Sequence, residues 1–153
     1  MADEGKFLRP GFFARACNRI LLGAGRAGVS VAGSRVLTVV GRKTGLARST
    51  PVNPLVLATE TYLVAARGNT HWARNLRSAR TGELTLGRTA TPFTAVELSR
   101  REKIPILRIY LAKWSWEVGS FFHLPKNPTD EAIEAIADAH PVFRIELQSS
   151  QRR

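Results

Sequence analysis

The sequence has one cysteine, Cys17, among its 153 residues, so no disulfide can form within the chain, which fits a reducing compartment. It also lacks any apolar run of about 18 residues, the length that a membrane-spanning helix requires. Asp3 and Glu4 precede an apolar stretch that arginines interrupt, which excludes a secretory signal. We therefore expect a cytoplasmic protein. Its length, with 44% apolar and 23% charged residues, is typical of one globular domain.

Acidic residues are scarce in the first half of the chain. None occurs from Gly5 to Thr59, a stretch that contains nine lysines or arginines. Most of the net charge of +11 therefore belongs to residues 1–80, with 13 bases against 3 acids. This asymmetry predicts an anionic partner, which can be nucleic acid, an acidic membrane surface or a polyanionic small molecule, unless the charge only keeps the surface soluble. The 18 arginines against 5 lysines favour directed contacts to phosphate or carboxylate groups.

No group of residues indicates metal binding or nucleophilic catalysis. His71, His123 and His140 are scattered and Cys17 stands alone, so no spacing suits a zinc site and we expect no metal. The sequence also contains no nucleophile elbow and no Ser/His/Asp signature.

Two glycine-rich segments resemble nucleotide-binding motifs without matching them. Residues 23–28 fit G-x-G-x-x-G, but a predicted helix precedes them and no acid follows at the required distance, so we interpret them as a linker. Gly41-Arg42-Lys43-Thr44-Gly45 lacks the spacing of a phosphate-binding P-loop. Its glycines and the bases around it, which include Arg48, still favour an anion-binding loop, with a solvated β-turn as the alternative.

The periodicity of apolar residues predicts a mixture of helices and strands. Helices are expected over 10–24, 71–79, 99–118 with a break near Pro105, and 129–138 with Thr129 or Asp130 as its cap. Strands are expected over 34–40, 49–57, 61–66, 83–87, 90–98 and 142–147. Pro51 and Pro54 place the strand 49–57 at an edge or a bulge. The short turns between strands favour an α+β fold: an antiparallel, barrel-like sheet over residues 34–150, with flanking helices, after an amphipathic helix and linker over 1–33.

Two blocks of this sequence, taken together, resemble a known family. The first comprises Thr38 and Gly41–Pro51, and the second comprises His71, Trp72, Asn75 and Leu76. In this order and separation they resemble the nitroreductase-like family of deazaflavin (coenzyme F420)-dependent oxidoreductases. The second block departs from the family pattern, because His71 directly precedes Trp72 and Ala73 stands where tyrosine is usual.

The resemblance implies an actinobacterial enzyme with a split β-barrel of the FMN-binding-protein type. Such an enzyme uses reduced coenzyme F420, an 8-hydroxy-5-deazaflavin with a phosphodiester and a polyglutamate tail, to transfer a hydride to a quinone, nitro compound or activated alkene. Matching positions imply that the phosphate and tail are held by Arg42, Lys43, Thr44, Gly45 and Arg48. By the same match, the ring and ribityl chain would be lined by Val36, Leu37, Thr38, Ala65, Ala66, Arg67 and Gly68. Trp72 and Asn75 would support this site.

Aromatic residues gather after residue 110, where they either pack in the core or form a wall for a flat acceptor. We expect substrate contacts from this group, which contains Trp114, Trp116, Phe121 and Phe122. The proton donor stays unassigned, since Tyr62 and Tyr110 are the only tyrosines and Asn53 stands where the family often has a third.

Two other classes remain open, a nucleic-acid-binding module and a membrane-surface-binding module without catalysis. Against nucleic acid, the bases cluster in a turn rather than along a recognition helix, so we expect no nucleic-acid partner. The predicted helix over 10–24 could also bring an enzyme to the inner face of the membrane. The oligomeric state is left open.

Overall fold

The computed structural model describes residues 35–86, 88–122, 124 and 128–149, with the backbone alone for 114–122. The helix and linker expected over 1–33 lie outside the described residues. In the described part of the chain, no helix is both long enough and apolar enough to cross a membrane.

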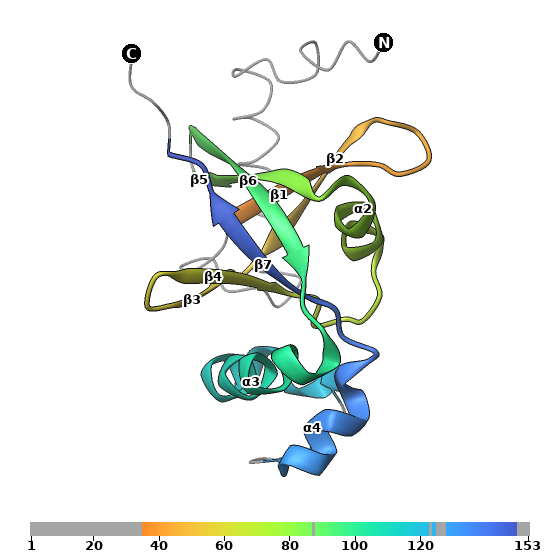
Figure 1. Ribbon diagram of the computed structural model, residues 1–153, viewed down its shortest axis with the longest axis vertical. Coiled ribbons are helices and arrows are strands. Elements are labelled where there is room, and N and C mark those ends of the chain that lie inside the picture. Colours follow the sequence, from red (N-terminus) through yellow and green to blue (C-terminus); the bar gives the residue numbers. More distant parts are fainter. Residues whose placement is uncertain (1–34, 87, 123, 125–127, 150–153) are drawn as a thin grey trace.

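Seven antiparallel strands form one curled sheet in the order β2-β1-β5-β6-β7-β4-β3 (Figure 1). Their bounds are Arg35–Val40 (β1), Ala47–Val52 (β2), Leu55–Leu57 (β3), Glu60–Val64 (β4), Thr81–Leu86 (β5), Thr89–Glu97 (β6) and Val142–Leu147 (β7). The hairpins β1–β2, β3–β4 and β5–β6 are local, whereas β7 comes from the end of the chain and pairs with β6 and β4. The predicted split β-barrel is therefore confirmed.

Closure of the barrel depends on a very short link. β2 and β3 are the two edge strands of the sheet, yet only Asn53 and Pro54 separate them. A link of two residues can span only about 10 Å, since an extended chain advances at most about 3.3–3.6 Å per residue. The two edges must therefore lie close together, which curls the sheet.

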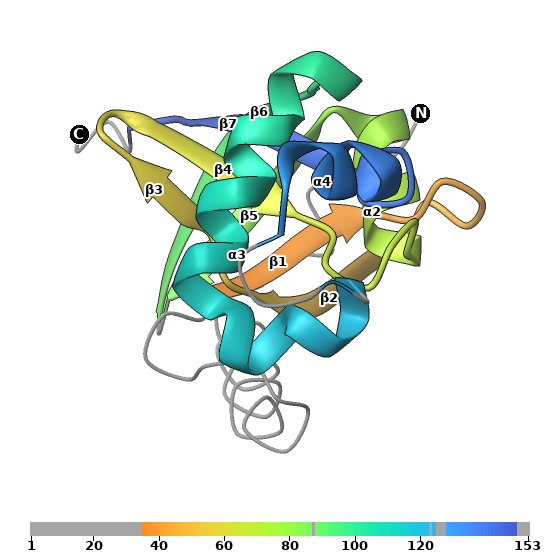
Figure 2. The ribbon, with the colours of Figure 1, turned by 90° about the horizontal axis from the view of Figure 1, so that it is seen from below.

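Three helices complete the described fold: His71–Ala79 (α2), Arg100–Phe122 (α3) and Asp130–Ala137 (α4). α2 packs against β1, β5 and β6, while α3 and α4 pack together at another end of the barrel (Figures 1 and 2). The buried apolar residues form two clusters. The interior of the barrel and the inner face of α2 share one cluster, in which Leu37, Phe93 and Phe143 are at most 1% exposed. A second cluster, centred on Leu107 and Ile133, joins the helices α3 and α4 to the sheet.

Two expectations about proline need correction. The strand expected over 49–57 is divided into β2 and β3, because the chain leaves one edge at Asn53-Pro54 and joins the other. The break expected near Pro105 is absent from the backbone, since α3 continues through it. Pro105 removes only the one backbone hydrogen bond that an N–H at this position would donate to Arg101 O, and the helix continues on both sides of it. A capping box stabilises the start of the helix: Ser99 Oγ accepts from Glu102 N, and Glu102 Oε1 accepts from Ser99 N.

Candidate functional site

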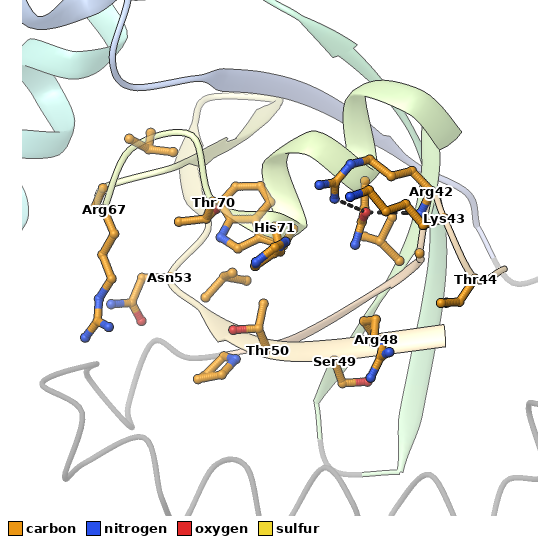
Figure 3. A pocket seen from close by; sticks show the side chains of 18 of the residues that line it. Arg42, Lys43, Thr44, Arg48, Ser49, Thr50, Asn53, Arg67, Thr70 and His71 are labelled. Atoms are coloured by element: carbon orange, nitrogen blue, oxygen red, sulfur yellow. Dashed lines mark hydrogen bonds between the residues drawn. The ribbon is translucent and has the colours of Figure 1, made fainter. Parts of the chain in front are cut away.

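A cavity of about 750 Å³ opens between the β1–β2 loop and β2 on one side and α2 with the loop before it on the other (Figure 3). Five consecutive residues of β2, from Arg48 to Val52, line the cavity, so both faces of this edge strand contribute to it. From the opposite side come the β4–α2 loop and the first residues of α2. Tyr110 of α3, which is 3% exposed, is also part of the lining.

The β1–β2 loop is a compact turn that projects beyond the barrel (Figure 1). Gly41 N donates to Leu46 O at 2.8 Å, and Gly45 N donates to Gly41 O at 2.9 Å. Gly45 has a φ of +71°, a conformation that side chains disfavour. A Cβ on Gly41 would lie 3.0 Å from Thr44 Oγ1 and 3.2 Å from Leu46 O, so a larger residue here would require these neighbours to shift. The turn thus presents the bases beside it in a defined geometry.

Asn75 connects this loop to α2. Its Oδ1 accepts from the Arg42 backbone N at 3.1 Å and from the Arg42 guanidinium Nη1 at 2.8 Å (Figure 3). Asn75 is 5% exposed, so leaving its Oδ1 without a hydrogen bond would cost folding free energy. Arg42 is therefore held by the helix, while Lys43 and Arg48 are exposed beside it.

The charged side chains that line the cavity are all basic. Arg42, Lys43 and Arg48 gather at one end, and Arg67 lies with Asn53 at the other (Figure 3). None of the described residues that line the cavity is an aspartate or glutamate. The lining also contains the apolar residues Val39, Val52, Val64, Ala66 and Trp72, whereas the polar residues Thr50, Thr70 and His71 lie between the two ends (Figure 3). Such a cavity favours an elongated ligand with a flat apolar part and an anionic part.

Two threonines at helix starts differ in a way that points to a ligand. Thr129 precedes α4, and its Oγ1 accepts from Ala132 N as an ordinary N-cap does. Thr70 occupies the same place before α2, but its side chain makes no cap hydrogen bond. Its Oγ1 is buried without a partner among the described residues and belongs to the lining of the cavity. A polar atom in this state is expected to find its partner in a bound molecule or water.

An ion pair secures α2 on the sheet outside the cavity. Arg77 Nε and Nη2 donate to the two carboxylate oxygens of Glu97 on β6, both at 2.8 Å. This pairing lowers the pKa of Glu97 and raises that of Arg77. Burial raises the pKa of Glu83 on β5 and lowers that of Lys103 on α3. None of these four groups lines the cavity.

The structure brings together eight of the residues expected in the cofactor site. Those that line the cavity are Arg42, Lys43, Thr44, Arg48, Ala66, Arg67, Trp72 and Asn75. Those that do not are Val36, Leu37, Thr38, Gly45, Ala65 and Gly68. Val36 and Leu37 are 0% exposed, backbone included, and so do not reach the cavity, and Thr38 Oγ1 lies 2.9 Å from Ser49 Oγ. The side chains of Trp114, Trp116 and Phe121 lie outside the described part of the structure.

The other lining residues were not assigned to the site from the sequence, and they are Val39, Gly41, Ser49, Thr50, Pro51, Val52, Asn53, Val64, Thr70, His71 and Tyr110. For residues 49–52 a signal existed, because they directly follow Arg48 in the same strand. No local signal marks Tyr110, which reaches the cavity from α3.

The curled antiparallel sheet defines a split β-barrel, and the cavity beside its edge strand is basic, with no acid among the described lining residues. The sequence identifies the family. The family model of F420H2-dependent quinone reductases matches residues 17–117, and the chain belongs to this family. The protein is thus an oxidoreductase that depends on coenzyme F420, which confirms the expected class and cofactor.

Solved structures show the same fold. A protein of unknown function from Agrobacterium tumefaciens is 14% identical, with a TM-score of 0.53 over 76% of this chain. This chain spans only 49% of the length of that protein. An F420-H2 dependent reductase, FDR-A, is 20% identical, with a TM-score of 0.50 over 74% of this chain and 94% of its own. At these identities the likeness concerns the fold alone. No curated protein matches the chain by sequence.

Proposed function

We propose that this protein transfers a hydride from reduced coenzyme F420 to a quinone, with the coenzyme bound in the cavity beside β2. The observation that carries the proposal is the distribution of charge along the cavity. Three bases stand at one end, the rest of the lining combines apolar side chains such as Val52 and Trp72 with the hydroxyls of Thr50 and Thr70, and no acid is present among the described lining residues. This order of surfaces corresponds to the order of groups in F420, which has a flat ring at one end and an anionic tail at the other.

The residues present fit this coenzyme. The volume of about 750 Å³ is in the range of sites for small molecules and cofactors. Lys43 and Arg48 are exposed at the mouth, where they would pair with the phosphodiester and the glutamate tail, and Arg42 would add a third cation whose direction Asn75 sets. The buried hydroxyl of Thr70 supplies a polar partner for the ribityl chain or the ring.

Reduced F420 supplies a hydride from its deazaflavin ring, and the acceptor gains this hydride and a proton. The contribution of the protein is to hold and orient the reactants and to exclude water. Trp72 lies between the cavity and the barrel core. The centroid of its ring is 6.1 Å from that of Phe143, and the two ring planes are inclined by 50°. Trp72 therefore forms a rigid wall, while Ala66 leaves space for a flat ring.

Among the expected acceptors, the description of the family favours a quinone over a nitro compound or an activated alkene. A small-molecule acceptor is also favoured over a nucleic acid, because Lys43 and Arg48 line a cavity instead of an extended surface. A wall for the acceptor from Trp114, Trp116 and Phe121, and a membrane contact through residues 10–24, stay parts of this proposal that rest on the sequence.

The test is a titration of the purified protein with oxidised F420, followed by its fluorescence, beside a titration with FMN. We expect F420 to bind far more tightly than FMN. Reduced F420 is then mixed with a benzoquinone, a nitroimidazole and an activated alkene, and its oxidation is followed by absorbance. Fastest turnover with the quinone supports the proposal. Equal or tighter binding of FMN, or no turnover of the quinone, would contradict it.

A further inference from the structure

We propose that His140, which does not line the cavity, is a positioning residue that holds the Ala65–Thr70 loop in the shape needed for ligand binding. This inference rests on the proposed function, since that loop carries Ala66 and Arg67 into the cavity. His140 is 6% exposed and lies in the turn between α4 and β7. No motif in the sequence marks it.

The turn that contains His140 supports the loop from behind at three points. Ala65 N donates to Pro141 O at 2.9 Å, and the His140 ring Nδ1 lies 3.1 Å from Ala65 O. Gly68, with a φ of +98°, lies so near the turn that a Cβ there would be 3.3 Å from Ala139 O. The loop is thus fitted to residues 139–141 along its length.

The hydrogen bond to Ala65 has a defined direction. A carbonyl oxygen only accepts, so His140 Nδ1 must carry the proton and donate it. The same oxygen also accepts from Gly68 N at 3.0 Å, which closes the tight turn of the loop. Two donors therefore converge on one buried carbonyl, one from within the loop and one from the turn behind it. This arrangement fixes the peptide plane that precedes Ala66 and so sets the direction in which Ala66 and Arg67 leave the barrel.

His140 is itself held in place from α3. Lys103 Nζ lies 3.4 Å from the His140 carbonyl oxygen, and Lys103 is only 7% exposed. Burial of a lysine is unfavourable unless its ammonium group finds partners, which makes this contact a specific feature of the packing. A line of contacts thus runs from α3 through His140 to Ala65 and reaches the cavity at Ala66.

Two substitutions separate the hydrogen bond from the volume of the ring. His140→Asn keeps an N–H donor at the position of Nδ1 but removes most of the ring, whereas His140→Phe keeps the ring but removes the donor. If His140 acts as a positioning residue, the Phe variant is the more damaging for the loop. If it acts only as packing, the Asn variant is the more damaging, because it leaves a cavity.

The first readout is hydrogen exchange of the Gly68 and Thr70 amides in the free protein. We expect His140→Phe to speed this exchange about fivefold, which corresponds to the loss of one typical hydrogen bond, while His140→Asn stays near wild type. The second readout is steady-state turnover of reduced F420 with a quinone. We expect kcat/KM to fall about tenfold in His140→Phe and little in His140→Asn, although His140→Asn has the lower Tm.

Exchange and turnover that instead follow Tm, with His140→Asn worse than His140→Phe, would overturn the inference. Equal exchange in both variants and in the wild type would overturn it as well. If the wild type oxidises no reduced F420 with any quinone, the proposed function fails, and the exchange rates still decide whether His140 holds the loop.

Discussion

Asn75 Oδ1 accepts two hydrogen bonds from Arg42, one from its backbone N at 3.1 Å and one from its guanidinium at 2.8 Å. The pair joins residues 33 positions apart in the sequence and connects the basic loop to α2. The loop is therefore positioned before any ligand arrives, which reduces the conformational entropy lost on binding.

This relationship predicts a specific coupling between the two residues. Asn75→Leu removes the acceptor, and we expect it to weaken F420 binding about five- to tenfold, since the loss of such hydrogen bonds costs about 1 kcal/mol. Arg42→Met should weaken binding as well. Because Asn75 acts through Arg42, the double variant should be little worse than Arg42→Met alone, which fluorescence titration of all three proteins would show. Fully additive losses would mean that Asn75 acts on the ligand by another route.

Charge reversal tests the basic end of the cavity. Lys43→Glu and Arg48→Glu should each weaken F420 binding at least about tenfold, since a hydrogen bond to a charged group contributes about 1.5–3 kcal/mol. Thermal stability should change little, because both side chains are exposed. Arg88→Glu is a matched control, since Arg88 is exposed in the β5–β6 turn, does not line the cavity, and changes the net charge equally. A similar loss in the Arg88 variant would indicate a general electrostatic effect instead of a binding site.

The ion pair between Arg77 and Glu97 predicts a pH-dependent contribution to stability. Arg77 lowers the pKa of Glu97 in the folded protein, so the stabilisation is fully present above the unfolded value of about 4.3. It is lost as the pH falls through the lower, folded pKa. Both side chains are partly exposed, so we expect Glu97→Gln to cost no more than about 1 kcal/mol at pH 7. Urea denaturation at neutral and at acidic pH should show the difference from wild type shrinking in acid, and a constant difference would contradict this account.

The aromatic residues after position 110 allow a fourth test. If Trp114 or Trp116 contacts a flat acceptor, its replacement by Ala should raise KM for a quinone, since stacking adds about 0.5–1.5 kcal/mol. The affinity for F420 should stay nearly unchanged. A core role predicts a loss of about 3–5 kcal/mol of stability instead, with unchanged kinetics in the protein that remains folded. Measurement of Tm and KM for both variants separates these roles.

The sequence predicts the elements of this fold well where the pattern is local. Trp72, Leu76 and Ala79 recur at helical spacing, and α2 has the predicted bounds. Pro51 and Pro54 indicated an edge strand, and both edges of the sheet lie beside them. That the chain changes edges between them could not be predicted, because partner choice depends on β1 and β4 at a distance. The break expected near Pro105 was wrong, since the loss of one backbone hydrogen bond does not interrupt a helix as long as α3.

The site was predictable to the extent that its residues share a motif. Arg42, Lys43, Thr44 and Arg48 are close in sequence and meet at one end of the cavity. Thr70 and Tyr110 were missed because packing brings them there from other segments. Val36 and Leu37, assigned through the resemblance, have side chains that the core covers completely, a fact that only the packing of β1 reveals.

The short Asn53-Pro54 link has a consequence for the behaviour of the protein at high concentration. Edge strands are the places where a sheet recruits strands from other molecules and begins to aggregate. Here both edges converge on one seam, where Pro51 lacks the N–H that an added strand would need and Arg48 adds repulsive charge. A second copy could extend β2 only by entering the surroundings of the ligand cavity. The seam beside the cavity is thus also the place where Pro51 and Arg48 oppose the addition of a strand from another molecule.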